Sequence, residues 1–205
     1  MLRNFLYISL LVLYSTVLYA ENHQKIPVDE EFKSAIKYVE KKQFFEAYQI
    51  FSSLAELEIP EAQFNLALLY SNGLGTPKNF RLALYWSWQA HLNDHETAIE
   101  QVNKTYELIN ENLRNSVAET TIEELVASAQ AGDRAAPLKL GKTYLGLFVE
   151  AQNQPAYLWL SISQAYGEER ASALLEEAAS QMTLEEVLAQ QEEAQKSFND
   201  MIKKN

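Results

Sequence analysis

The chain has 205 residues, with 28 acidic against 17 basic side chains and a formal net charge of −11. Such an acidic chain is repelled by phosphate backbones and by anionic membrane surfaces, which argues against nucleic acid as a partner. It contains no cysteine, so disulfides, thiol catalysis and thiolate metal sites are excluded and stability has to come from packing.

Residues 1–20 have the order of a secretory signal peptide. Arg3 gives a basic start, residues 5–17 are almost wholly apolar, and Ala20 offers a small residue before polar Glu21. The apolar run is shorter than the ~20 residues that a membrane-spanning helix needs. We therefore expect cleavage after Ala20, a periplasmic or secreted protein, and no membrane contact after cleavage. The alternative is an uncleaved N-terminal membrane anchor.

After a short linker expected at 21–30, apolar residues recur at helical spacing, and no strand-like alternation occurs. Pro60, Pro137 and Pro155 suit first helical turns, where a missing N–H costs little. The expected helices span roughly 31–41, 44–57, 60–72, 79–92, 95–111, 121–131, 134–147, 154–166, 168–181 and 183–203.

Short motifs predict where several of these helices begin and end. Residues 121–124 and 183–186 both read Thr-x-Glu-Glu, the capping box in which Thr and Glu satisfy each other's free backbone N–H groups. Gly73 and Gly75, followed by Pro77, predict a helix stop and a restart.

An internal repeat organises the chain. An Ala-x-x-x-Leu/Val-x-x-x-Tyr pattern recurs, and its first alanines are spaced by 36, 38 and 35 residues. The copies are Ala62-Leu66-Tyr70, Ala98-Val102-Tyr106 and Ala136-Leu140-Tyr144, with Ala171 and Leu175 at the next expected place.

A second series lies between these copies. Ala83 and Trp86 match Ala156 and Trp159, whereas the middle copy has Thr121 and Glu124 at the corresponding places. Each copy therefore reads as two amphipathic helices that must stack on a neighbour to bury both faces. The sequence predicts an all-α, α/α superhelical solenoid over 31–181, with the best copies at 62–97 and 136–170 and a degenerate copy at 98–131.

The C-terminal segment 182–205 differs from the repeats. Its apolar residues form one stripe, with acidic residues facing away. We expect a capping helix that closes the array. The alternative is a docking or dimerisation helix.

Residues 61–90 resemble a Sel-one-like repeat, a relative of the tetratricopeptide repeat. The family pattern is A-x-x-x-L-G-x-x-Y, then G-x-G-V-x-x-D, then A-x-x-W, then A-A-x-x-G. This chain supplies Ala62, Leu66, Tyr70, Gly73, Gly75, Ala83, Trp86 and Ala90, and departs from the pattern at Ala67, Thr76, Asn79 and Asp94. The resemblance implies a bacterial exported member that acts as an adaptor in protein–protein or envelope interactions. A cysteine-rich branch associated with β-lactams is not carried over, because this chain has no cysteine.

No pattern in the sequence predicts catalysis, a metal or a cofactor. Residues 136–143 match a loose phosphate-loop pattern, but they fill helical repeat positions and no strand precedes them. His91 and His95 have a metal-chelating spacing, but a turn is expected between them. The glycosylation sequon at 103–105 lies inside a predicted helix. We therefore expect a protein that is not an enzyme.

Partner-binding residues are expected on the first helix of each pair, outside the buried repeat positions. Phe64 could anchor a peptide, and the lysines could meet carboxylates; alternatively, Phe64 packs on Phe51 or Leu54 and the lysines only solubilise. Tyr85 and Trp88, which flank Trp86, are open to both interpretations. The candidates are Gln63, Phe64, Ser71, Lys139, Lys142 and Thr143.

The predicted function is an exported repeat adaptor that holds a protein or peptide partner on its concave face. One alternative is an envelope hydrolase acting on cell-wall material. Another is a membrane-tethered, self-associating structural subunit.

Overall fold

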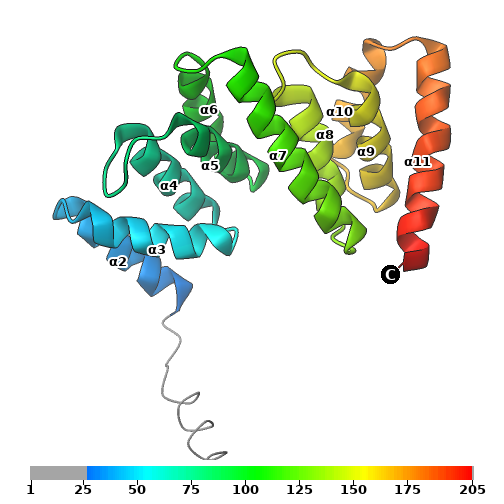
Figure 1. Ribbon diagram of the computed structural model, residues 1–205. Coiled ribbons are helices and arrows are strands. Elements are labelled where there is room, and N and C mark those ends of the chain that lie inside the picture. Colours follow the sequence, from blue (N-terminus) through cyan, green and yellow to red (C-terminus); the bar gives the residue numbers. More distant parts are fainter. Residues whose placement is uncertain (1–26, 205) are drawn as a thin grey trace, which may run out of the picture.

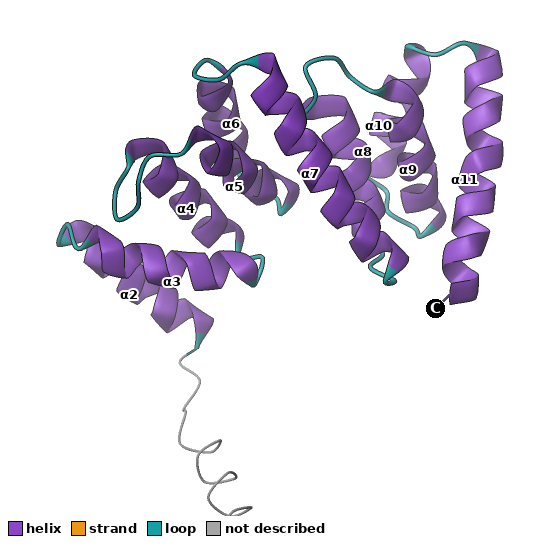
Figure 2. Ribbon diagram, in the orientation of Figure 1, coloured by secondary structure: helices purple, strands orange, loops and turns teal. Residues whose placement is uncertain are grey.

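The computed structural model describes residues 27–204, and every regular element in that range is a helix (Figures 1 and 2). The predicted signal segment and residues 21–26 lie outside the described residues. The first helix begins at Val28, within the segment expected to be linker. The helices are α2 (Val28–Glu40), α3 (Phe44–Glu56), α4 (Pro60–Asn72), α5 (Phe80–Leu92), α6 (Ala98–Tyr106), α7 (Glu111–Gln130), α8 (Ala136–Gly146), α9 (Asn153–Ala165), α10 (Ala171–Ser180) and α11 (Leu184–Lys204).

The helices pack largely on their neighbours in the chain and form an arch (Figure 1). Successive helices pack on each other from α2 to α6 and again from α7 to α10, and α7 also packs on α5. This arrangement is an α/α solenoid, so the predicted fold class is confirmed. None of the helices within residues 27–204 is long and apolar enough to cross a membrane.

The C-terminal helix α11 packs along α9. Ala194 and Met201 are buried there, and the ring of Phe198 lies 5.2 Å from that of Tyr166. The α11 helix thus covers α9, the second helix of the copy at 136–170, as a capping helix should.

The alanines of the repeat occupy the helix crossings. All of them have no exposed surface, so each lies where a neighbouring helix approaches the backbone closely. They are Ala47, Ala62, Ala83, Ala98, Ala136, Ala156 and Ala171.

Two glycines mark closer approaches still. A Cβ on Gly141, in the middle of α8, would lie 2.4 Å from Cγ of Leu160 on α9. A Cβ on Gly75 would lie 2.2 Å from the carbonyl oxygen of Phe44, and Gly75 has a φ of 72°. Gly141 therefore permits a close approach of α8 and α9.

The three repeat tyrosines are all partly buried near the ends of α4, α6 and α8. Tyr70 hydrogen-bonds the hydroxyl of Tyr48 at 3.0 Å, and Tyr106 donates to the carbonyl oxygen of Gly146 at 3.1 Å. Tyr144 stacks on Phe148 with a centroid distance of 5.9 Å. These tyrosines share their place near the end of a first helix and their partial burial, although each has its own partner.

The degenerate copy contains the main error of the sequence prediction. The helix expected at 121–131 begins at Glu111, and the helix expected at 95–111 ends at Tyr106. Asn110 caps α7, because its side-chain oxygen accepts from the Leu113 N–H at 2.8 Å. Thr121 lies inside α7 and donates to the Val117 carbonyl oxygen, so it opens no helix.

The second capping box is confirmed at the start of α11. Glu186 accepts from the Thr183 N–H at 2.7 Å, and the Glu186 N–H donates to the Thr183 hydroxyl at 3.3 Å. Pro60 and Pro137 occupy the first turns of α4 and α8, as expected.

We predict that Gly141→Ala lowers the free energy of unfolding by about 1–3 kcal/mol, because the new methyl overlaps Leu160. Chemical denaturation measures this effect. In a Leu160→Ala background the clash is absent, so alanine should instead stabilise the helix by about 0.5–1 kcal/mol. An equal loss in both backgrounds would contradict the proposed contact.

Candidate functional site

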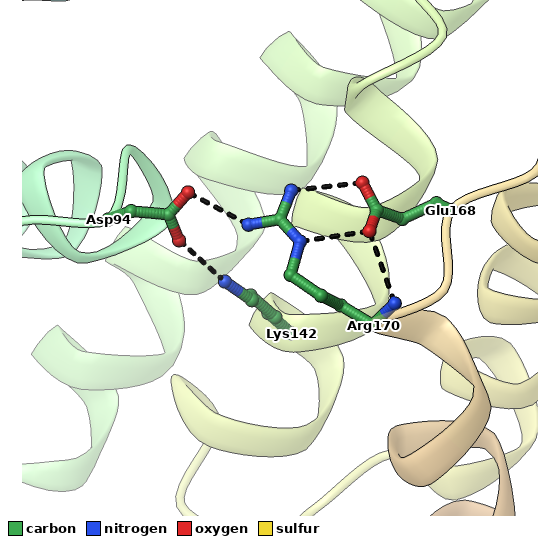
Figure 3. A network of polar contacts seen from close by, with 4 residues as sticks. All are labelled: Asp94, Lys142, Glu168 and Arg170. Carbon is green, nitrogen blue, oxygen red and sulfur yellow. Dashed lines mark hydrogen bonds and ion pairs between the residues drawn. The ribbon is translucent and has the colours of Figure 1, made fainter.

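A charged network connects distant parts of the array (Figure 3). Asp94 lies in the turn after α5, Lys142 on α8, and Glu168 and Arg170 in the turn before α10. Arg170 contacts Asp94 at 2.8 Å, and its Nε and Nη2 donate to the two carboxylate oxygens of Glu168, each at 2.9 Å. Lys142 contacts the other oxygen of Asp94 at 3.4 Å.

A second ion pair spans the array. Lys139 on α8 contacts Glu58, in the turn after α3, at 2.8 Å. The side chains of Lys139 and Lys142 are only 12% and 18% exposed. Both candidate lysines therefore form ion pairs with carboxylates of their own chain. These pairs bring the turns after α3 and α5 against α8, although the degenerate copy separates them in the sequence.

The network shifts the acidity of its carboxyl groups. Hydrogen bonds from the Arg170 side chain and backbone lower the pKa of Glu168 to about 2. Partial burial alone would raise the pKa of Asp94, but Arg170 and Lys142 together lower it. Both carboxylates stay ionised well below neutral pH.

Two of the six predicted partner-binding residues are inside the protein. Gln63 is 2% exposed; it donates to the Ala55 carbonyl oxygen at 3.2 Å and accepts from Asn93 at 2.9 Å. Thr143 is fully buried and accepts from the indole N–H of Trp88 at 3.1 Å. Their expected surface role is wrong, because both satisfy buried polar groups between helices.

Phe64 is partly buried and stacks on His95 with a centroid distance of 4.2 Å. His95 is a different neighbour from Phe51 and Leu54, the alternative packing partners, and the predicted peptide-anchoring role of Phe64 stays a prediction. His91 lies in the last turn of α5, and burial, followed by the nearby Lys142, lowers its pKa. Residues 27–204 contain no group of three or more metal-ligating side chains. Ser71, at the end of α4, is partly exposed, and its predicted binding role stays a prediction.

In the array, α5 lies between α3 and α7 (Figure 1). Residues of these three helices line a groove along α5. It consists of two adjoining hollows, one of about 310 Å³ and one of about 160 Å³. Four residues line both hollows and so form the centre of the groove: Glu56, Tyr85, Trp86 and Glu124. We call this feature the α5 groove.

The centre of the α5 groove combines two aromatic rings with two carboxylates. Tyr85 donates to Glu124 at 2.7 Å, and its ring meets Trp86 edge-on at 5.0 Å. Burial, then Glu124 and Glu56, raise the pKa of Tyr85, so its hydroxyl remains a donor. Tyr85 and Trp86 are partly exposed, while both glutamates are exposed.

The ends of the groove carry cations that are already engaged. Arg81, in the first hollow, donates to the hydroxyl of Ser116 at 2.9 Å. Lys139, in the second hollow, pairs with Glu58. The basic side chains that line the groove therefore make contacts other than with the two central carboxylates.

The sequence placed the predicted binding residues on the first helices of the pairs and, of the groove's centre, left only Tyr85 open to a binding role. The groove is lined mainly by second helices, α3, α5 and α7. One signal was present: Glu124 stands where the better copies have Trp86 and Trp159. Trp88, by contrast, is 2% exposed and belongs to the core.

No protein-family model matches the sequence. The chain is 31% identical over 127 residues to chitin synthase regulatory factor 3 of Schizosaccharomyces pombe. The alignment covers 58% of this chain but only 14% of that protein.

Two solved structures are similar. A Sel1 repeat protein from Oxalobacter formigenes is 19% identical, with a TM-score of 0.33 and coverage of 95% of this chain and 98% of that one. The antigen c5321 of uropathogenic Escherichia coli, described as displaying an SLR fold, is 18% identical, with a TM-score of 0.33 and coverage of 92% and 48%. The fold assignment of the present chain rests on its own stacked helix pairs.

We predict that Thr143→Val lowers the free energy of unfolding by about 1–3 kcal/mol, because it leaves the buried Trp88 N–H without an acceptor. Thr120→Val is the matched control, since exposed Thr120 makes the same bond to the carbonyl four residues earlier. Equal losses in the two variants, measured by urea denaturation, would show that the buried bond contributes nothing.

We predict that Asp94→Asn lowers the Tm by roughly 1–3 °C at pH 7 and has a smaller effect near pH 3. The folded-state pKa values of Asp94 and Glu168 lie below their usual values. The network therefore stabilises the protein above about pH 4–5, and this contribution is lost as the pH falls through the folded values. Asp200→Asn, at an exposed site on α11, serves as the control in the same melting experiments. A difference that does not change with pH would contradict this account.

Proposed function

We propose that this protein is an adaptor that binds an extended segment of a partner protein in the α5 groove. The observation that carries the proposal is the pair of partly exposed aromatic side chains, Tyr85 and Trp86, at the centre of the groove. Aromatic residues of this kind supply much of the energy in protein interfaces, because they bury a large area with few rotatable bonds.

The scaffold suits this role because its surface is already formed. The α3, α5 and α7 walls are held by α5–α7 packing and by the ion pair between Lys139 and Glu58. A partner segment then bears most of the ordering cost, which favours binding to such a surface. The name of the curated relative, a regulatory factor, supports an interaction role.

The proposed location is the cell envelope or the exterior, with export directed by residues 1–20. Support comes from the basic start, the apolar run and the small residue at Ala20. The adaptor would then act after cleavage, without its own membrane contact.

The test is site-specific photocrosslinking in the cells that produce the protein. A photoreactive residue at Gln89, which lines the groove, should capture a defined protein identified by mass spectrometry. The same residue at Glu107, an exposed position just after α6, is the matched control and should not capture it. The captured protein, once purified, should bind the wild-type chain and bind a Tyr85→Ala/Trp86→Ala variant at least tenfold more weakly.

Capture of the same proteins from both positions, or binding that does not depend on the two aromatic residues, would contradict the proposed function. Circular dichroism of the variant shows whether the array remains folded.

A further inference from the structure

We infer that the segment bound in the α5 groove presents an arginine side chain to its centre. This inference rests on the proposed function and adds the chemistry of the partner. It follows from the charges at the centre of the groove, from the aromatic surface beside them and from the place of Glu124 in the repeat.

The centre of the groove is negative and lacks a basic counterpart. Glu56 at the end of α3 and Glu124 on α7 line it from its two walls. Among residues 27–204, no lysine, arginine or histidine forms an ion pair with either carboxylate. Of the cations that line the groove, Lys139 is paired with Glu58, and Arg81 donates to the uncharged hydroxyl of Ser116 and forms no ion pair with Glu56 or Glu124. A cation supplied by a partner would complement these two carboxylates, neither of which forms an ion pair within residues 27–204.

The aromatic side chains favour a guanidinium over an ammonium group. Trp86 and Tyr85 line the same two hollows as the carboxylates and are partly exposed. A planar guanidinium stacks on an aromatic face and donates in a fork to carboxylates, whereas an ammonium is a compact, strongly hydrated point charge. The Tyr85 hydroxyl already donates to one oxygen of Glu124, which leaves the other oxygen available to a ligand.

The chain uses the same kind of contact elsewhere. The guanidinium of Arg114 lies 3.8 Å from the ring centroid of Tyr106 and donates to the carbonyl oxygen of Leu147 at 2.8 Å. The spacing between α6, α7 and the end of α8 therefore lets an arginine stack on a repeat tyrosine and donate to an oxygen atom at the same time.

Glu124 also differs from the residues at the equivalent positions of the other repeat copies. The places that correspond to Glu124 hold Trp86 and Trp159 in the better copies. In the degenerate copy an exposed carboxylate on α7, which packs on α5, stands where the two better copies have a half-buried tryptophan. This difference reduces apolar contact area and gives the groove its second negative charge.

The experiment is a selection of random 12-residue peptides displayed on phage, performed on the full folded chain. The enriched sequences should contain arginine. A synthetic version of the leading peptide should bind a Glu56→Gln/Glu124→Gln variant at least about tenfold more weakly, because both charge partners of the guanidinium are gone. Glutamine keeps the side-chain size and, at 124, an oxygen that accepts from Tyr85.

A matched control separates the groove from overall charge. Glu100→Gln/Glu107→Gln changes the net charge equally at two exposed positions on and just after α6, and should alter the affinity by less than about twofold. Replacing the peptide's arginine with citrulline, its neutral isostere, should weaken binding as much as the groove variant does. Replacing it with lysine should give an intermediate affinity.

The outcomes separate the two proposals. Enriched peptides that lack arginine, or that bind the groove variant as tightly as the wild type, would overturn the arginine inference and leave the adaptor function standing. The absence of any enriched peptide would overturn both.

Discussion

Close approach of helices at alanine and glycine positions is the constraint on which this structure depends. Where Ala83, Ala98, Ala136 and Ala156 meet their neighbours no side-chain surface remains exposed, and Gly141 leaves no room for even a methyl group against Leu160. Small residues at the crossings bring the helix axes together, and the spacing between axes follows from the side chains at the contact. Because the alanines recur about every 36 residues, each pair is placed on the last in a similar way.

Tight stacking has consequences at a longer range. The turns after α3 and α5 come to lie against α8, where Glu58 and Asp94 find Lys139 and Lys142. Those lysines are therefore part of the scaffold and not free to bind a partner. The partner-facing chemistry lies on the second helices, where Tyr85 and Trp86 meet the carboxylates of α3 and α7. The ion pairs that hold the scaffold and the aromatic centre of the groove thus use different side chains of the array.

Features that depend on local sequence could be predicted. The box at Thr183 and the proline at Pro60 act within a single turn, and the repeat alanines follow from periodicity alone. Features that depend on distant residues could not be predicted. Residues 121–124 match the capping-box pattern, but Asn110 caps a longer helix whose apolar face already includes Val117. Gln63 and Thr143 look like surface residues until the structure places Asn93 and Trp88 beside them.

The central claim is that the array curls enough to bring the turn after α3 against α8, and an intramolecular crosslink tests it most directly. The chain has no cysteine, so Glu58→Cys/Lys139→Cys gives one defined pair for a short bis-maleimide. We expect rapid crosslinking within the native monomer and little in urea, because the two positions are 81 residues apart in sequence. Equally slow reaction in the native and the unfolded chain would contradict the account, since the turn after α3 would then lie away from α8.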